Sequence, residues 1–405
     1  MRVLSCVAGL GVMLAGVGAE ASPQDLFGYG PWATSCAGLG QTTADDYTAV
    51  HGNPASLSAM RTREVALGFA ATGFALTRGG AHAAADRGAA TTIGLGLPVP
   101  FGGLLRGRVG VGLGFFTPTE IIVRGRVLQP ETPQFVNLPD RVQTVALQLG
   151  VGVDLGRGFR VGAGVMAMAG LSGAVLVTTD ATGRAGSRID TQLVATYAPV
   201  VGLRFDRGAW RAGVVYRGEL EARFRVTIDA PDLGVPIPTL DIAGLAQFDP
   251  AQVGLEAAWR RGDLTVMAGL TGKRWSAYPG PNAATTPASP APPAPEFRDT
   301  VVPRLAVAWA RQWDDGTGLS LRGGVFYEPT PAPLPTAARQ YLDNDRLALT
   351  AGVGLSARAG GSTLRADTAL QVHHLIGREG PGPGGASTTY GGNLVVASVT
   401  LGASF

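Results

Sequence analysis

The sequence predicts an all-β protein, a transmembrane antiparallel β-barrel of about 14 strands with a small N-terminal hatch, or plug, in its lumen. Most of the chain alternates apolar and polar residues with a period of two, and its connections alternate between short and long. After the N-terminus, no window holds the roughly 18 consecutive apolar residues that a membrane-spanning helix needs. Strands would therefore have to cross the membrane.

Composition agrees with this fold class. Gly accounts for 60 of the 405 residues and Pro for 28, and charged residues make up 16%, against roughly 25% in soluble domains. Charged residues are scattered along the chain, with a formal net charge of +3. A basic stripe with interleaved aromatic residues is missing, so nucleic-acid binding has no support. We expect a protein whose outer surface lies in lipid.

The clearest alternation lies between 346 and 358. One face carries Leu347, Leu349, Ala351, Val353, Leu355 and Ala357, and the other face is polar or tiny. Similar patterns occupy 141–155, 210–228, 264–275, 319–328 and 364–373. Alternation alone fits both a soluble sandwich and a membrane barrel, because one face of each strand is apolar in both.

Connection lengths separate these two folds. Short turns lie around Gly158, Gly208, Gly262, Gly316 and Gly360. Between them come longer Pro-rich or polar connections at 129–140, 178–190, 230–246, 279–296, 329–345 and 377–389, and a further long and short pair lies at 78–87 and 98–106. This alternation is typical of outer-membrane barrels, with tight periplasmic turns and long outer loops. We therefore expect the outer membrane of a Gram-negative bacterium.

The last predicted strand, 390–405, ends on Phe405. An aromatic terminus after alternating apolar residues resembles the signal that the barrel-assembly machinery recognises, and closing the sheet would remove its exposed edge. Further aromatic residues near strand ends fit an interfacial girdle in contact with outer-membrane lipid; they are Tyr216, Trp259, Trp275, Trp309, Trp313 and Tyr327.

The N-terminus has the features of a secretory signal peptide, residues 1–21. Arg2 supplies the positive charge, 3–17 the apolar core and 19–21 a small-x-small cleavage site. Cys36 would then be the one cysteine of the mature chain, which excludes an intramolecular disulfide and a cysteine-based zinc site. We expect Cys36 to be a small buried hydrophobe.

The stretch 35–57 differs from the rest of the chain. It is rich in Gly and Pro, among them Gly38, Gly40 and Pro54, and it carries the acid pair Asp45 and Asp46. We predict that 22–62 forms a compact hatch inside a barrel made by 63–405. Asn53 before Pro54 is a helix-start or turn signal. The two aspartates are expected to cap a short helical turn or to pair with lumen arginines.

Two motifs carry a family resemblance. The run from Gly38 to Asp46, followed by Asn53-Pro54-Ala55-Ser56-Leu57, resembles the N-terminal hatch of the FadL-type outer-membrane transporters of long-chain fatty acids and aromatic hydrocarbons. The second motif runs from Arg322 through Tyr327-Glu328-Pro329 to Asp343 and Arg346, with Leu342 where that family usually has proline. The resemblance covers both ends of the mature chain in the right order.

The resemblance implies a monomeric barrel, closed by the hatch, that takes up hydrophobic molecules without ATP. It also implies that ligand leaves sideways through a gap beside a kinked third strand. The corresponding strand here, 108–120, contains Gly110, Gly112, Gly114 and Pro118, and such residues weaken strand pairing.

Strand parity selects candidate residues for the ligand path. Lys273, the sole lysine, lies with Trp275 on the inferred inner face, and an ammonium could bind a ligand carboxylate. The full set of candidates is Lys273, Trp275, Arg304, Arg322, Phe326 and Arg365. Parity also places other charged residues in the lumen, where we expect most of them to be paired; these are Arg211, Arg217, Glu219, Arg223, Arg225, Glu256, Arg346 and Asp367.

No catalytic, metal or cofactor site is predicted. The histidines lie in different regions, no G-x-S-x-G motif follows a strand, and the adjacent His373 and His374 would point to opposite faces of one strand. Glycines 110–114 lack the context of a dinucleotide-binding loop. Two alternatives to a transporter stay open, an outer-membrane barrel enzyme of the lipase or phospholipase kind and a general or structural porin. Fatty acid, terpene and monoaromatic compound all stay open as substrate.

Overall fold

The strands close into a barrel. A computed structural model describes residues 24, 29–83, 85, 87–119, 134–135, 145–179, 185–229, 239–281, 293–336, 339–382 and 386–405. Within them, 14 strands pair antiparallel in a ring. The predicted fold class is thus confirmed, whereas the predicted signal peptide, 1–21, lies outside the described residues.

The ring follows chain order, and β9 pairs with β12 because β10 and β11 do not belong to the ring. Its strands are β1 (Glu64–Arg78), β3 (Gly88–Val99), β4 (Val109–Pro118), β6 (Ala146–Gly156), β7 (Phe159–Thr179), β8 (Ala185–Arg207), β9 (Trp210–Arg217), β12 (Gln252–Arg261), β13 (Leu264–Lys273), β14 (Thr300–Gln312), β15 (Gly318–Glu328), β17 (Arg346–Ala359), β18 (Ser362–Pro381) and β19 (Ser387–Ser404). β19 pairs with β1 from Ser404 opposite Glu64 to Tyr390 opposite Arg78, which closes the ring.

The remaining elements attach to this ring or lie within it. They are β2 (Ala81–Ala83), β5 (Gln134–Phe135), β10 (Leu220–Asp229), β11 (Leu240–Asp249) and β16 (Tyr341–Leu342), with the short helices α2 (Gly30–Ser35), α3 (Ala49–Gly52), η1 (Pro54–Ala59), η2 (Gly103–Leu105) and η3 (Trp275–Ala277). Among the described residues, no helix is long and apolar enough to span a membrane.

The alternating faces point as predicted. Leu347 and Leu349 of β17 are exposed on the outside, whereas Ala348 between them is completely buried in the lumen. His373 is buried and its neighbour His374 is exposed, so the two imidazoles lie on opposite sides of the wall. The outer surface is therefore apolar, and the interior holds the polar and small residues.

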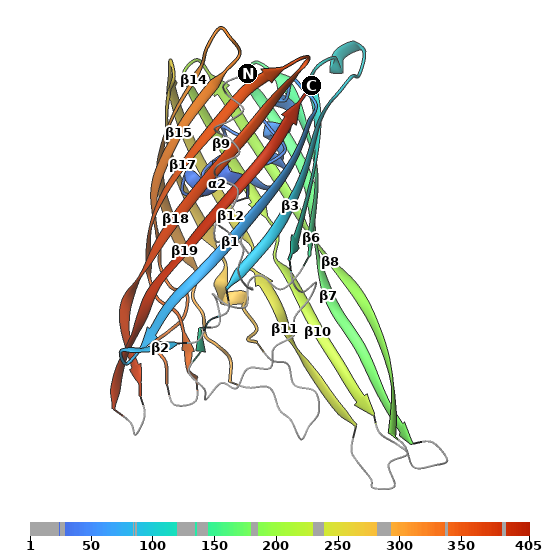
Figure 1. Ribbon diagram of the computed structural model, residues 1–405, viewed down its shortest axis with the longest axis vertical. Helices are drawn as coiled ribbons and strands as arrows, with labels where there is room; N and C mark the ends of the chain where they lie inside the picture. Colours follow the sequence, from blue (N-terminus) through green and yellow to red (C-terminus); the bar gives the residue numbers. More distant parts are fainter. Residues whose placement is uncertain are drawn as a thin grey trace.

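Several predicted long connections are partly strand. β7 and β8 extend into 178–190, β11 begins within 230–246, and β18 and β19 extend into 377–389. Figure 1 shows β7, β8, β10 and β11 projecting beyond the rest of the barrel, at the end opposite the C-terminus. A hairpin can continue past the membrane because its two strands satisfy each other's backbone groups, whatever the polarity of the side chains.

The predicted single strand 210–228 breaks in two at Gly218 and Glu219. Beyond the break, β10 leaves β8 and pairs in parallel with β7. The backbone of Arg223 lies 2.6 Å from where a Cβ on Gly170 of β7 would be, so β10 crosses the inner face of the wall. The break reverses side-chain parity: Phe224 is buried, and Arg223 is exposed. Alternation continued from β9 therefore does not place Glu219, Arg223 and Arg225, whose side chains are exposed.

The predicted kink in the third strand is absent from its described residues. β4 pairs with β3 from Val109 to Pro118 and with β6 from Val109 to Phe116 in continuous register. Its glycines do not weaken the ladder, because Gly110, Gly112 and Gly114 are paired on both sides, whereas Pro118 is paired with β3 alone among the described residues. They instead make room for the hatch inside the barrel.

Candidate functional site: the hatch in the barrel lumen

The hatch, residues 29–60 of the structure, fills the lumen near the short turns. Figure 1 shows its helix α2 inside the ring of strands, towards the end that carries the C-terminus. Cys36, Ala49, Ala55 and Leu57 are completely buried there. Burial raises the pKa of the Cys36 thiol to about 12, so this cysteine is a neutral, inert hydrophobe, as predicted.

Glycines on the inner wall form the seat of η1. A Cβ on Gly110 would lie 2.0 Å from the Leu57 carbonyl oxygen, one on Gly152 would lie 2.4 Å from the Pro54 carbonyl oxygen, and one on Gly162 would lie 2.1 Å from the Ala55 nitrogen. Real Cβ atoms do not approach other atoms that closely, so larger residues would push η1 away from the wall. This contact explains part of the high glycine content of the lumen face.

Asn53 fixes where η1 begins. Its backbone is extended, its side-chain oxygen accepts a hydrogen bond from the Ala55 nitrogen at 3.1 Å, and its amide group donates to the Leu203 carbonyl at 2.9 Å. Pro54 follows as the first helical residue, where its missing N–H is harmless. The helix start predicted at these two residues is therefore present, and the same side chain binds the wall.

The acid pair joins the hatch to two wall arginines. Asp45 lies 3.2 Å from the Arg204 guanidinium and Asp46 lies 3.1 Å from that of Arg365. Arg365 also pairs with Glu64 at 2.6 Å, which joins the hatch to the first residue of β1. Both aspartates pair with lumen arginines, and Asp46 also caps a short turn, because its carboxylate accepts the Thr48 N–H at 2.9 Å just before α3.

Wall side chains also bind the backbone of the first half of the hatch. The Thr350 hydroxyl donates to the Ser35 carbonyl at 2.7 Å and accepts from the Ala37 nitrogen at 3.2 Å. Gln371 donates to the Thr34 carbonyl at 2.6 Å. These contacts satisfy backbone groups that a short helix leaves without partners.

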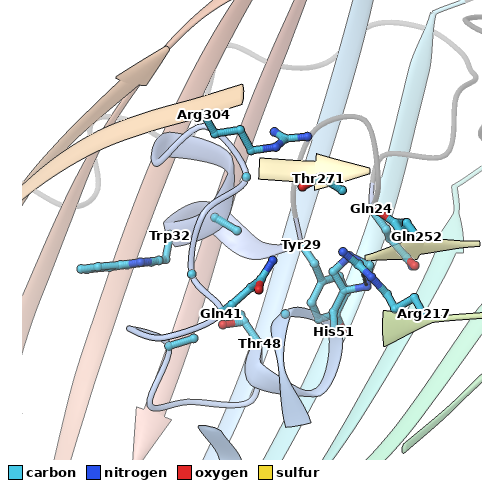
Figure 2. A pocket seen from close by; sticks show the side chains of 15 residues that line it. Gln24, Tyr29, Trp32, Gln41, Thr48, His51, Arg217, Gln252, Thr271 and Arg304 are labelled. Carbon is cyan, nitrogen blue, oxygen red and sulfur yellow. Dashed lines mark hydrogen bonds between the residues drawn. The ribbon is translucent and has the colours of Figure 1, made fainter. Parts of the chain in front are cut away.

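A small cavity of about 40 Å³ adjoins the hatch (Figure 2). Hatch residues meet wall residues around it, and none of the described residues that line it carries a carboxylate. Its polar and aromatic lining comprises Gln24, Tyr29, Trp32, Gln41, Thr48, His51, Arg217, Gln252, Thr271 and Arg304. Arg217 contacts the His51 ring at 2.6 Å. Burial raises the pKa of Tyr29, so its phenol stays neutral.

Comparison with solved structures finds proteins of this architecture. A FadL homologue from Pseudomonas aeruginosa matches with a TM-score of 0.63 and 15% identity, over 96% of this chain and 99% of that one. The toluene transporter TodX of P. putida matches at 0.57 and 14% over 94% and 99%, and the toluene transporter TbuX of Ralstonia pickettii at 0.56 and 17% over 94% and 99%.

The chain has the FadL-type fold. This likeness rests on structure, since the identities are low. Comparison of the sequence with protein-family models and with curated proteins finds no match. The fold that the two sequence motifs implied is thereby confirmed.

Three arginines among the six predicted ligand-path residues bind the hatch of this FadL-type barrel, and Phe326 shares an apolar cluster with Ala37 of the hatch. Arg304 donates to the Ala37 carbonyl at 2.6 Å and lies over the Phe326 ring. Arg322 lies over the Trp32 ring of the hatch and pairs with Asp367 at 2.7 Å. Arg365 is the third, through Asp46. Their guanidinium groups thus hold the hatch, and Phe326 is buried beside one of them.

Lys273 lies in a buried ion cluster. Its ammonium pairs with Glu328 at 2.7 Å, and the other oxygen of that carboxylate lies 2.9 Å from Arg346. All three side chains are almost fully buried. The carboxylate that Lys273 binds in this FadL-type barrel is therefore one of its own, contributed by the second sequence motif.

Trp275 lies outside the strand to which parity assigned it. It begins η3 and is buried, so it is not part of an outer girdle. It packs with Phe248, Phe297 and Tyr341 in an apolar cluster. A second apolar cluster includes Leu76, Phe116 and Leu342. A third includes Met166, Met168 and Phe224 and lies where β10 crosses the wall.

Sequence reasoning missed several wall residues that hold the hatch, among them Arg204, Glu256, Thr350, Gln371 and Gln148. Parity placed Glu256 in the lumen without a role, and the others were not singled out. Which wall side chain meets which hatch residue depends on which strands surround that part of the lumen. Sequence alternation carries no signal for that.

Proposed function

We propose that this protein is a passive outer-membrane channel for the uptake of hydrophobic small molecules. The observation that carries the proposal is a closed barrel with an apolar outer surface, whose lumen holds both a docked hatch and apolar clusters. A general porin has a polar, water-filled interior. Packing such as that of Phe224 against Met166 and Met168 suits an apolar solute better.

Cargo passes when the hatch moves. The hatch is held largely by polar contacts, which can be exchanged with water, and the barrel closes with a single chain, so a monomer suffices. The matched toluene transporters support a hydrocarbon cargo, and the FadL homologue has the same fold.

Uptake in cells that lack their own hydrophobic channels tests this function. Cells producing the protein should take up labelled toluene or labelled oleate faster than cells with an empty vector, saturably and without sensitivity to an uncoupler. A labelled disaccharide should enter no faster. Equal entry of all three compounds would indicate a porin, and no gain for either apolar compound would contradict the proposal.

A pair of variants sharpens this test. Phe224→Gln places an amide in the apolar cluster under β10 and should reduce uptake several-fold. Leu104→Gln alters a side chain that is 90% exposed at the short-turn end and should leave uptake unchanged.

A further inference from the structure

One turn of the hatch sits in a socket of the wall. The turn, residues 39–42, faces three glycines of β9, β12 and β13, and we call this recess the socket. A Cβ on Gly254 would lie 2.3 Å from the side-chain amide nitrogen of Gln41, and one on Gly269 would lie 2.6 Å from the Leu39 side chain. A Cβ on the third glycine, Gly213, would lie 2.9 Å from the Thr42 methyl group.

Glu256 lies at the centre of the socket and binds the turn four times. One carboxylate oxygen accepts the Gly40 nitrogen at 2.8 Å and the Gln41 nitrogen at 2.9 Å. The other oxygen accepts the Thr42 nitrogen at 3.0 Å and the Thr42 hydroxyl at 2.6 Å. Glu256 is 4% exposed, so water competes little for these bonds. Three successive backbone N–H groups that converge on one anion form a strong, charge-assisted site.

The two halves of the hatch are held differently. The half that contains η1 lies against wall glycines, backbone to backbone, and it buries Ala55 and Leu57 completely. Moving it would remove apolar surface from contact and empty a closely fitted seat. The half that contains the turn also buries Leu39 in an apolar cluster with Met267, but four of its hydrogen bonds converge on one residue, Glu256. Loss of that one carboxylate would therefore remove four hydrogen bonds of the turn at once.

We propose that Glu256 is the latch of the hatch: its carboxylate holds the turn 39–42 in the socket, and release of this turn opens the lumen while η1 stays seated. The physiological role of this latch rests on the proposed function, whereas the contacts that form it do not. Gly38, Gly40 and Gln41 also line the cavity of Figure 2, so the turn is a wall of that cavity. When the turn leaves the socket, the cavity and the emptied socket form one continuous space.

Cys36 supplies a native reporter for this movement. It lies three residues before the turn, it is completely buried, and its raised pKa makes it inert while the turn is docked. The experiment places the purified full-length protein in phosphatidylcholine vesicles and measures its labelling by N-ethylmaleimide without denaturant. Mass spectrometry then quantifies the peptide that contains Cys36.

Glu256→Gln keeps the size of the side chain and removes the charge. It should raise the labelling rate about tenfold or more, which corresponds to losing one or more charge-assisted hydrogen bonds. Thr42→Val removes only the hydroxyl donor and should give a smaller increase. Glu221→Gln breaks an ion pair with Arg223 elsewhere on the wall and should label at the wild-type rate.

Wild-type labelling rates for both Glu256→Gln and Thr42→Val, in barrels that stay folded, would overturn the assignment. If Glu256→Gln fails to fold, a wild-type rate for Thr42→Val alone would do so. Equal acceleration by Glu221→Gln would also overturn it, because general loosening of the barrel would then explain the effect. Labelling needs no cargo, so failure of the uptake assay and failure of the latch are distinguishable.

Discussion

Replacing Gly162 with alanine should displace the hatch. A Cβ at this position of β7 would lie 2.1 Å from the Ala55 nitrogen and 2.3 Å from the Pro54 carbonyl carbon. Ordinary contact begins at 3.4 Å, so η1 would have to retreat by the difference, 3.4 − 2.1 = 1.3 Å. The obstructing atoms belong to the backbone, so no side-chain rotation can relieve the clash.

The displacement also breaks a hydrogen bond. The Asn53 amide donates to the Leu203 carbonyl at 2.9 Å, and a shift of this size would stretch that contact beyond hydrogen-bonding distance. Overpacking of this kind costs about 1–3 kcal/mol, and the lost hydrogen bond adds about 1 kcal/mol. The free energy that favours the seated hatch over a displaced one should therefore fall by this amount, while the hydrogen bonds between the strands stay intact.

Ion conductance in planar bilayers measures this outcome. The wild-type barrel should conduct little because the hatch obstructs its lumen, and Gly162→Ala should show frequent open events. Gly272→Ala is the matched control, since it also adds a methyl group to a strand glycine and would meet no atom within 4 Å. Equal conductance of Gly162→Ala and wild type, in a folded barrel, would refute the argument that wall glycines seat the hatch.

Three further outcomes follow from single contacts. Lys273→Met removes one of the two cations that pair with the buried Glu328 and should lower the free energy of unfolding by about 3–5 kcal/mol. Glu328→Gln should cost at least as much because it leaves two buried cations; thermal unfolding in detergent measures both, and an unchanged midpoint would contradict the buried cluster. Asn53→Ala removes the cap of η1 and its bond to the wall, so it should destabilise the docked hatch by about 1–2 kcal/mol, seen as faster proteolysis of the hatch than in wild type. Thr350→Val removes a hydroxyl that makes two bonds to the hatch and should likewise speed proteolysis, and rates equal to wild type would argue against its bridging role.

Much of the fold could be predicted from local pattern. Period-two alternation identifies which side chains of β17 face lipid, because successive side chains of a strand point in opposite directions. Turn and loop lengths identify a membrane barrel because the two ends of such a barrel meet different surroundings. The hatch could be predicted because its Gly and Pro content and its acid pair fit neither alternating strands nor a long helix.

Local pattern failed where the chain changes partners. Parity assigned Arg223 and Arg225 to the lumen by continuing the alternation of β9. The break at Gly218 reverses that alternation, since β10 crosses the inner wall to pair with β7. The glycines of β4 suggested a weakened strand, yet its ladder is continuous and they receive the hatch. A glycine has the same sequence signature whether it loosens pairing or admits a neighbour.

The sequence by itself determined that this chain is a strand-rich barrel with an N-terminal hatch, because alternation, turn spacing and composition act over a few neighbouring residues. Only the tertiary structure decided what holds the hatch. Glu256 meets Gly40 across 216 residues of chain, and Thr350 meets Ser35 across 315. Such contacts arise from closure of the ring, which brings distant strands around one lumen, and closure is a property of the whole sheet that no local segment records.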